Sequence, residues 1–272
     1  MNFISKVLGA SNANRTVIKT VLVNIAMEAE AAPLVEHLGL TKCECNGDES
    51  NGDGGQSANI LSGPMPAVVY EGEVNECKIF VVTNGKDPKY GVDNVGTVCA
   101  GLVTYLSLLA ISPDIVINAG TCGGFISKGA QVGDVFISSA FKNHDRRIAI
   151  PGFSEWGIGD YAAVPTPNLV KELGYKTGVV TTGNSLDHVP KDDEIMAAND
   201  ASVKDMEGAA IAAVAEMYNT PCFGVKVVTD LVDGDKPTED EFLQNLSAAA
   251  NSLKEAMPKV IDFVLNKPIA DL

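Results

Sequence analysis

The 272-residue sequence lacks the residue clusters that hold metals or crosslink secreted domains. It has only three histidines, and no two of them stand at metal-binding spacing. Its six cysteines are scattered apart from one Cys-x-Cys pair in a polar stretch, which is neither a disulfide framework nor a zinc-ligand pattern. We therefore expect reduced thiols, no metal, no organic cofactor and a cytoplasmic protein.

Long apolar runs and an excess of positive charge are also missing. No apolar run is long enough to span a bilayer, and residues 1–17 contain no apolar core of signal-peptide length. Twenty basic residues stand against 35 acidic ones, which gives a formal charge of −15. Because such a surface repels polyanions, we expect neither nucleic acid nor a membrane as a partner.

What the sequence does contain is an alternation of strand-like and helical patterns. The expected strands are 20–27, 67–70, 78–83, 114–118, 133–138, 178–182 and 223–229, and the expected helices are 28–38, 92–110, 191–198, 206–218 and 239–266. This alternation predicts a single α/β domain with a central mixed β-sheet flanked by helices. We expect a disordered tail at residues 1–18, a folded domain at 19–272, and a flexible insertion at about 43–63, where Gly, Asn, Asp and Ser dominate.

Three acidic residues at the edges of apolar segments are candidate catalytic groups: Glu30, Glu207 and Asp230. Asp230 ends a predicted buried strand, where open α/β sheets place their ligands. A carboxyl group there faces a crevice, so its proton affinity can rise enough for acid catalysis. Each acid taken alone also has a structural interpretation, since Glu30 in the first turn of a helix is favoured by the helix dipole.

A glycine-rich segment, Asn118–Gly124, follows a predicted strand. Its glycines would allow a ligand to approach the backbone closely, and Thr121 offers a hydroxyl group. The same segment could equally be a tight turn, and it matches neither a dinucleotide-binding motif nor a P-loop. Two further motifs have structural interpretations: we expect His144 and Asp145 to form an ordered pair, and Asp233–Pro237 to form a turn that caps the last helix.

Four motifs appear together in one order along the chain: Ile25–Glu30, Asn118–Gly124, Lys204–Ala210 and Lys226–Asp233. In this order they resemble the 5′-methylthioadenosine/S-adenosylhomocysteine nucleosidases, within the nucleoside phosphorylase superfamily. The similarity extends from about Thr20 to the C-terminus, and the segments Asp233–Thr238 and Glu241–Leu246 resemble the plant-type branch. This resemblance implies hydrolysis of the N-ribosidic bond of methylthioadenosine, in methionine salvage.

The resemblance also implies roles for individual residues. Asp230 matches the general acid that protonates purine N7, and Glu30 matches the base that activates water. Glu207 matches the residue that binds the 2′- and 3′-hydroxyls of the ribose, with Met206 packing under the sugar. The other implied substrate-binding residues are Thr121 near the ribose, Leu186 at the adenine, and Lys204 and Asp205 of the third motif.

Some points of the resemblance leave alternatives. Asn184 stands where an Asp is usual, which affects the expected adenine pocket. Phosphorylases of the superfamily carry an arginine three residues before the loop hydroxyl, whereas this chain has Asn118 there, so water is the better nucleophile. A phosphorylase and a non-catalytic storage relative remain the alternatives. The resemblance further implies a homodimer whose partner chain helps to close the 5′ site, and it leaves open whether S-adenosylhomocysteine is accepted.

Overall fold

The computed structural model describes residues 17–43, 61 and 63–272. The described strands are β1 Thr20–Ile25, β2 Thr41–Lys42, β3 Val68–Val74, β4 Cys77–Thr83, β5 Ile115–Gly124, β6 Val135–Asn143, β7 Tyr161–Ala162, β8 Lys176–Thr182, β9 Ala201–Asp205 and β10 Cys222–Leu231. They form one mixed sheet in the order β10-β6-β8-β9-β5-β1-β4-β3-β2, with β7 attached to β6. The predicted single α/β domain with a mixed sheet is confirmed.

The long strand β5 joins two parts of this sheet. It pairs in parallel with β1 on one side and with β10 on the other, and its last residues also pair antiparallel with β9. Because β10 continues through β6 and β8 to β9, the β5–β10 pairing closes these five strands into a ring. The pattern of apolar segments predicted the strands but not this closure, which depends on pairings between distant segments.

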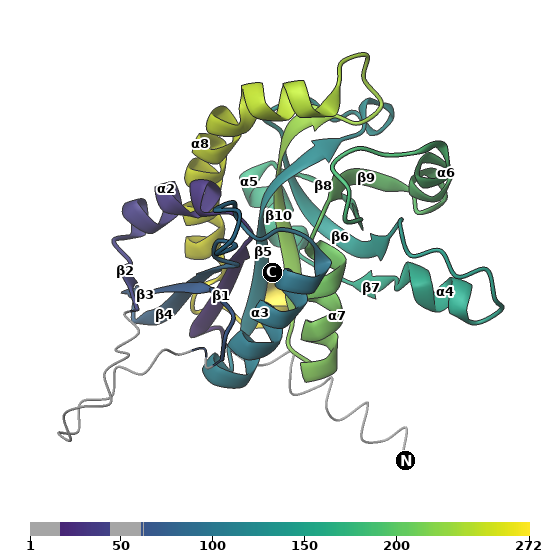
Figure 1. Cartoon of the computed structure of the whole chain (residues 1–272). Coiled ribbons are helices and arrows are strands. Elements are labelled where there is room, and N and C mark those ends of the chain that lie inside the picture. The colour runs from purple at the N-terminus through teal and green to yellow at the C-terminus, as the bar shows by residue number, and fades with distance from the viewer. Residues whose placement is uncertain (1–16, 44–60, 62) are drawn as a thin grey trace.

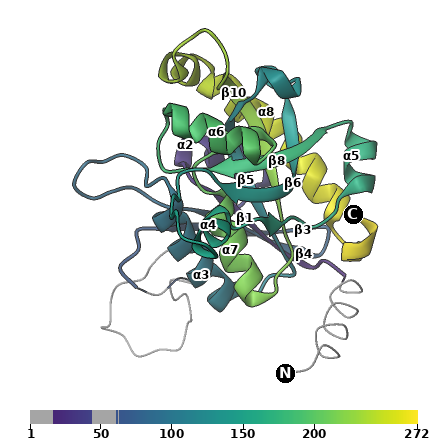
Figure 2. The same ribbon diagram turned by 90° about the vertical axis from the view of Figure 1, so that its right-hand side faces the viewer.

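Helices flank the sheet. They are α2 Glu28–Leu38, α3 Thr97–Ile111, α4 Phe153–Ile158, α5 Pro167–Leu173, α6 Pro190–Ala198, α7 Gly208–Tyr218 and α8 Thr238–Val264, with the short 3-10 helices η1 Ile126–Lys128 and η2 Ile269–Asp271. Helix α2 packs beside α8, and α3 packs beside α7 (Figure 1). Figure 2 shows α3 and α7 below strands β5, β6 and β8, and the first part of α8 above them. No helix in the described ranges is long and apolar enough to cross a membrane.

The core explains why these segments form strands. Nine of the ten residues of β10 are buried, as are five of the six in β1, and both strands are rich in valine and other apolar residues. Runs of this kind suit central strands that are covered on both faces. The longest helix, α8, has an apolar side that includes Leu253, Met257 and Val260, all fully buried, so it packs along the sheet as an amphipathic helix.

Several boundaries differ from those predicted. The segment Asn118–Gly124, expected as a loop after a strand, is the second half of β5 and is held by β10 and β9. Strand β9 and helices α4 and α5 were not predicted, because their short segments carry no clear apolar period. Ile18, placed in the predicted tail, is fully buried and its N–H donates to the Lys267 carbonyl, so the folded domain starts before residue 19. Residues 1–16 of that tail, and residues 44–60 and 62 of the predicted insertion, lie outside the described residues.

Candidate active site

A cavity of about 250 Å³ lies where the carboxyl ends of β1, β9 and β10 approach the second half of β5. All eight predicted site residues line it: Glu30, Thr121, Leu186, Lys204, Asp205, Met206, Glu207 and Asp230. They come from five different segments of the chain, so the folded structure brings together what the sequence separates by up to 200 residues. The remaining lining residues include Met27, Val95, Lys226, Thr238 and Phe242.

Glu30 is held by the backbone of β5. Its Oε1 accepts hydrogen bonds from the N–H of Thr121 at 2.8 Å and from the Thr121 hydroxyl at 2.6 Å, and its Oε2 accepts one from the N–H of Met27 at 3.3 Å. The side chain is buried although it stands in the first turn of α2. This geometry keeps a carboxylate inside the cavity and makes Thr121 its direct neighbour.

The start of α2 is fixed by a second carboxylate. Glu28 accepts hydrogen bonds from the hydroxyls of Tyr70 and Thr83, and its own N–H donates to Asp93 at 3.1 Å. These contacts tie the first turn of α2 to strands β3 and β4. Glu28 therefore has a structural role, while Glu30, two residues later, faces the cavity.

Asp230 reaches the cavity because of an irregularity in β10. The register between β10 and β5 shifts between Val228 and Asp230, which is a β-bulge that turns the side chain of Asp230. Asp230 Oδ1 accepts a hydrogen bond from the Thr229 hydroxyl at 2.6 Å. Space for the carboxyl group is made by Gly123, where an added Cβ would lie 2.7 Å from Asp230 Oδ2. A glycine of the predicted motif is thus required at this position.

Burial raises the pKa of the Asp230 carboxyl above its ordinary value. The hydrogen bond from Thr229 and the positive charge of Lys204 oppose this rise in pKa, while the nearby Glu241 adds to it. The raised pKa favours the protonated form that a general acid needs. Asp230 is therefore equipped to hold a proton inside the cavity.

Glu207 stands directly before α7. Its Oε1 accepts a hydrogen bond from the N–H of Gly96 at 2.8 Å, which links it to the start of α3. Burial and the neighbouring Asp205 raise its pKa to about 7, although Lys226 and the Gly96 hydrogen bond pull it down. This carboxylate can accept further hydrogen bonds from a ligand in the cavity.

The carboxylate of Asp205 makes three contacts within the protein. Oδ1 accepts a hydrogen bond from Thr182 at 2.6 Å, and Oδ2 accepts one from the N–H of Gly208 at 2.8 Å and pairs with Lys226 Nζ at 2.8 Å. Asp205 therefore connects β9 with β8, β10 and the start of α7. It also lines the cavity, where the sequence predicted a substrate-binding residue.

Comparison with known proteins places this arrangement. A family model for the phosphorylase superfamily matches residues 20–262. A 5′-methylthioadenosine nucleosidase of Arabidopsis thaliana is 48% identical over 255 residues, which cover 94% of this chain and 91% of the relative. A 5′-methylthioadenosine/S-adenosylhomocysteine nucleosidase of the same plant is 45% identical over 259 residues, covering 94% and 95%.

The chain belongs to the methylthioadenosine/S-adenosylhomocysteine nucleosidase family of the phosphorylase superfamily. The solved apo structure of Arabidopsis thaliana 5′-methylthioadenosine nucleosidase superposes with a TM-score of 0.88 at 47% identity, covering 94% of this chain and all of that one. The resemblance stated from four sequence motifs is confirmed.

Two lysines of this nucleosidase, Lys204 and Lys226, line the cavity and hold neighbouring groups in place. Lys204 Nζ donates hydrogen bonds to the carbonyls of Ser185 at 2.9 Å and Leu186 at 2.6 Å, so it holds the loop that follows β8. Burial lowers the pKa of Lys204. Lys226 is buried opposite Asp205; burial alone would lower its pKa, but Asp205 and Glu207 outweigh that effect and keep it raised.

Sequence reasoning missed Lys226 and the residues that α8 contributes, Thr238 and Phe242. A lysine inside the apolar run Phe223–Val228 was a signal that could have been used, because a charged residue in a buried strand requires a partner. Nothing in the local pattern of α8 indicated that its first turns reach the cavity. Among the described residues, no group of three or more His, Cys, Asp or Glu side chains is arranged to hold a metal ion.

One smaller prediction is corrected by the contacts. His144 and Asp145 do not pair with each other, because His144 Nδ1 contacts the Thr181 hydroxyl at 3.2 Å while Asp145 bonds to Asn184. The turn predicted at Asp233–Pro237 does precede α8 directly, with Pro237 at the N-cap position. Within this turn, the Asp233 carboxylate accepts hydrogen bonds from the N–H groups of Ile126 and Ser127 at the start of the 3-10 helix η1.

Proposed function

We propose that this protein hydrolyses the N-ribosidic bond of 5′-methylthioadenosine, releasing adenine and 5-methylthioribose. The observation that carries the proposal is that Glu30, Glu207 and Asp230 line one cavity, in a chain 48% identical to a 5′-methylthioadenosine nucleosidase. A storage protein would require none of these three carboxylates. The reaction would serve methionine salvage in the cytoplasm.

Asp230 is the general acid of the proposed mechanism. Adenine leaves as a neutral base only if N7 of the purine receives a proton while the bond to the ribose breaks. The buried carboxyl of Asp230, whose pKa is raised by burial, can hold that proton until the substrate is in place. Lys204 fixes the carbonyls of Ser185 and Leu186 on the same side of the cavity, and these shape the adenine subsite.

Glu30 is the general base that activates the attacking water in the proposed mechanism. Loss of adenine leaves positive charge on the ribosyl carbon, and a water molecule must attack this centre while losing a proton. The Glu30 carboxylate accepts that proton, and the Thr121 hydroxyl beside it helps to hold the water and ribose. Glu207 accepts hydrogen bonds from the 2′- and 3′-hydroxyls of the ribose, with Met206 packed under the sugar.

Water is favoured over phosphate as the nucleophile by the charges around the cavity. Of the two lysines in its lining, Lys204 is bound to backbone carbonyls and Lys226 is paired with Asp205. Asn118 occupies the position of the phosphate-binding arginine expected in phosphorylases. A phosphate ion beside Glu30 would also face a like charge, which is unfavourable in a buried site.

The decisive experiment measures adenine release from 5′-methylthioadenosine in phosphate-free buffer. We expect full activity without phosphate and 5-methylthioribose as the second product. Strict dependence on added phosphate, with a ribose 1-phosphate derivative as product, would show a phosphorylase instead. Folded protein that releases no adenine under either condition would favour a storage role. Repeating the assay with S-adenosylhomocysteine tests the second substrate for which one Arabidopsis relative is named.

We also propose that two copies of the chain form a homodimer through α3 and α7. Large apolar side chains are exposed along α3 at helical spacing: Val98, Leu102, Tyr105 and Leu109. Tyr105 makes an edge-to-face contact with Tyr218 of α7, so the two helices form one continuous surface. A monomer that exposed such a face to water would be unusual, whereas a second copy would bury it.

A further inference from the structure

Three segments of the chain meet at Asn184, in the loop between β8 and α6. Its Oδ1 accepts hydrogen bonds from the N–H of Thr97 at 2.9 Å and from the Thr97 hydroxyl at 2.8 Å. Its Nδ2 donates to Asp145 Oδ2 at 3.0 Å, and its backbone N–H donates to the same oxygen at 2.7 Å. Asn184 therefore connects the start of α3 with the loops that follow β6 and β8.

The residue before Thr97 is bonded to a side chain that lines the cavity. The preceding residue, Gly96, donates its N–H to Glu207 Oε1 at 2.8 Å. Two successive backbone N–H groups are thus fixed, one on Asn184 and one on Glu207. Gly96 has φ of +90°, in the region that favours glycine, and a Cβ added there would lie 3.0 Å from Asn184 Oδ1. This turn has little freedom to move while both contacts are made.

We propose that Asn184 is a positioning residue, which holds the Gly96–Thr97 turn so that the Gly96 N–H fixes the carboxylate of Glu207 in the cavity. The proposal rests on the proposed function for the role of Glu207 in binding the ribose hydroxyls. Asn184 does not line the cavity itself, so it acts through Glu207 and not by touching the substrate.

The contacts around position 184 explain why an asparagine suits it better than an aspartate. The contact with Thr97 needs an acceptor and the contact with Asp145 needs a donor, and an amide supplies both whereas a carboxylate supplies only acceptors. An Asp at position 184 would keep the acceptor but place a second carboxylate against Asp145. The other oxygen of Asp145, Oδ1, is buried and has no hydrogen-bond partner among the described residues, so a second carboxylate would face a group that is already incompletely hydrogen-bonded.

The hydrogen bond from the Gly96 N–H also affects the protonation of Glu207. The groups that face this carboxylate are Asp205 on β9, Lys226 on β10, Glu30 on α2, and Cys99 and the Gly96 N–H at the start of α3. The hydrogen bond from Gly96 lowers the pKa of Glu207, so loss of that bond raises the pKa further. Because binding the ribose hydroxyls requires an ionised acceptor, the acid limb of kcat/KM must then move to higher pH.

The test compares four variants with the wild type: Asn184→Ala, Asn184→Asp, the double variant Asn184→Asp with Asp145→Asn, and Asn168→Ala as control. Asn168 lies on α5, where its side chain donates one exposed hydrogen bond to the Asp271 carbonyl. The measurements are kcat and KM for 5′-methylthioadenosine from about pH 5 to about pH 9, and hydrogen exchange of the Gly96 and Thr97 amides.

We expect both single variants at position 184 to raise KM by about tenfold, the effect of one lost hydrogen bond to a charged group, with a smaller change in kcat. Their acid limbs should move to higher pH, and the Gly96 amide should exchange faster. The double variant should recover much of the loss, because it restores a donor opposite an acceptor, and Asn168→Ala should behave as the wild type.

Folded single variants with unchanged KM, acid limb and Gly96 exchange would overturn the proposal. So would a double variant no better than Asn184→Asp, since the loss would then not arise from the pair with Asp145. Amide exchange needs no substrate. If the wild type fails to cleave methylthioadenosine, the proposed function fails, while the exchange data still decide whether Asn184 holds the turn.

Discussion

At the scale of single residues, the three carboxylates of the cavity differ in what surrounds them. Glu30 accepts hydrogen bonds from two backbone N–H groups and the Thr121 hydroxyl, which fix the orientation of its carboxyl group. Asp230 accepts one hydrogen bond, from a hydroxyl, and its burial favours the protonated form. Glu207 is held by Gly96 and remains available to ligand hydroxyls. These differences in hydrogen bonding and burial are consistent with the different roles proposed for the three side chains.

Asp230→Asn tests the assignment of the general acid. Asparagine keeps the size of the side chain and a donor for purine N7 but cannot transfer a proton. General acid groups contribute roughly 10²- to 10⁴-fold, so we expect single-turnover adenine release to fall by that order while adenine-containing inhibitors still bind. Thermal unfolding of the same sample is the control. A folded variant with near-normal turnover would remove Asp230 from the mechanism.

At the scale of the elements, a buried ion pair connects two strands that are not neighbours. Lys226 on β10 and Asp205 on β9 lie in the ring of five strands but do not share a ladder, and their side chains meet at 2.8 Å with almost no exposure. Asp205 also receives hydrogen bonds from Thr182 on β8 and from the N–H of Gly208 at the start of α7. The pair therefore joins β10, which carries Asp230, to the end of β9, two residues before Glu207.

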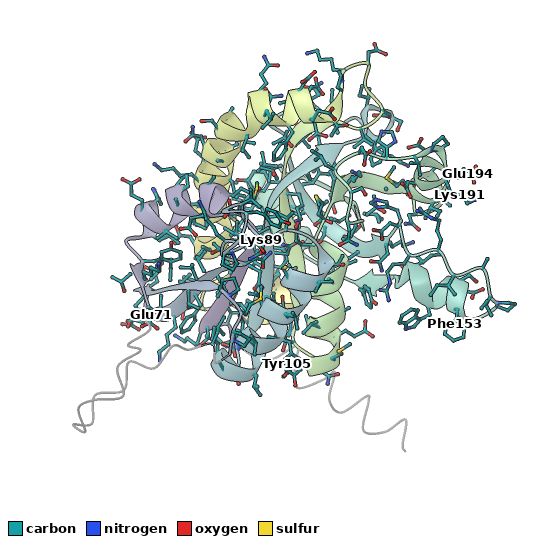
Figure 3. All side chains as sticks on the ribbon, viewed as in Figure 1. Glu71, Lys89, Tyr105, Phe153, Lys191 and Glu194 are labelled. Atoms are coloured by element: carbon teal, nitrogen blue, oxygen red, sulfur yellow. The ribbon has the colours of Figure 1, made fainter. Side chains whose placement is uncertain are left out.

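Lys226→Met tests what this pair contributes to stability. Removing one partner leaves the other charge buried without compensation, which typically costs about 3–5 kcal/mol. We expect the free energy of unfolding in urea to fall by about that amount. Lys191→Met is the matched control, because Lys191 pairs with Glu194 on the exposed surface of α6 (Figure 3), where a pair contributes about 1 kcal/mol or less. Equal losses in the two variants would contradict the structural role of the buried pair.

At the scale of the whole molecule, the surface formed by α3 and α7 carries several exposed apolar side chains. Val98 is 72% exposed and Leu109 is 62% exposed, and Met217 on α7 is 74% exposed. Tyr105, labelled in Figure 3, lies between these exposed positions of α3 and is itself 48% exposed. The first turn of the same helix provides the Gly96–Thr97 contacts to the cavity, so a partner on this face would lie close to the substrate site.

Leu102→Asp tests the proposed homodimer. A charge in the middle of the α3 stripe would be buried by the partner, so we expect the mass measured by light scattering to fall from two chains to one. Leu243→Asp is the control, because Leu243 is also exposed but lies on α8, and this variant should keep the mass of two chains. A wild-type protein with the mass of one chain would refute the proposal.

Much of this molecule was predictable because its local patterns agree with its fold. The apolar run before Asp230 and the helical pattern from Glu28 to Leu38 became β10 and α2, since both patterns suit buried elements. The eight candidate residues came from motifs and lie around one cavity. Strand β9 was missed because its five residues, Ala201–Asp205, include a lysine and an aspartate whose burial depends on partners elsewhere in the chain.

The sequence by itself determined the alternation of strands and helices, the family, and the acids available for catalysis, because these follow from side-chain chemistry and local spacing. Only the tertiary structure decided how those acids are used. The closure of β5 on β10, the partner of Lys226 and the three-way contact of Asn184 join segments that lie tens of residues or more apart. Such contacts leave no local pattern, because they arise when distant strands and loops meet at the same end of the sheet.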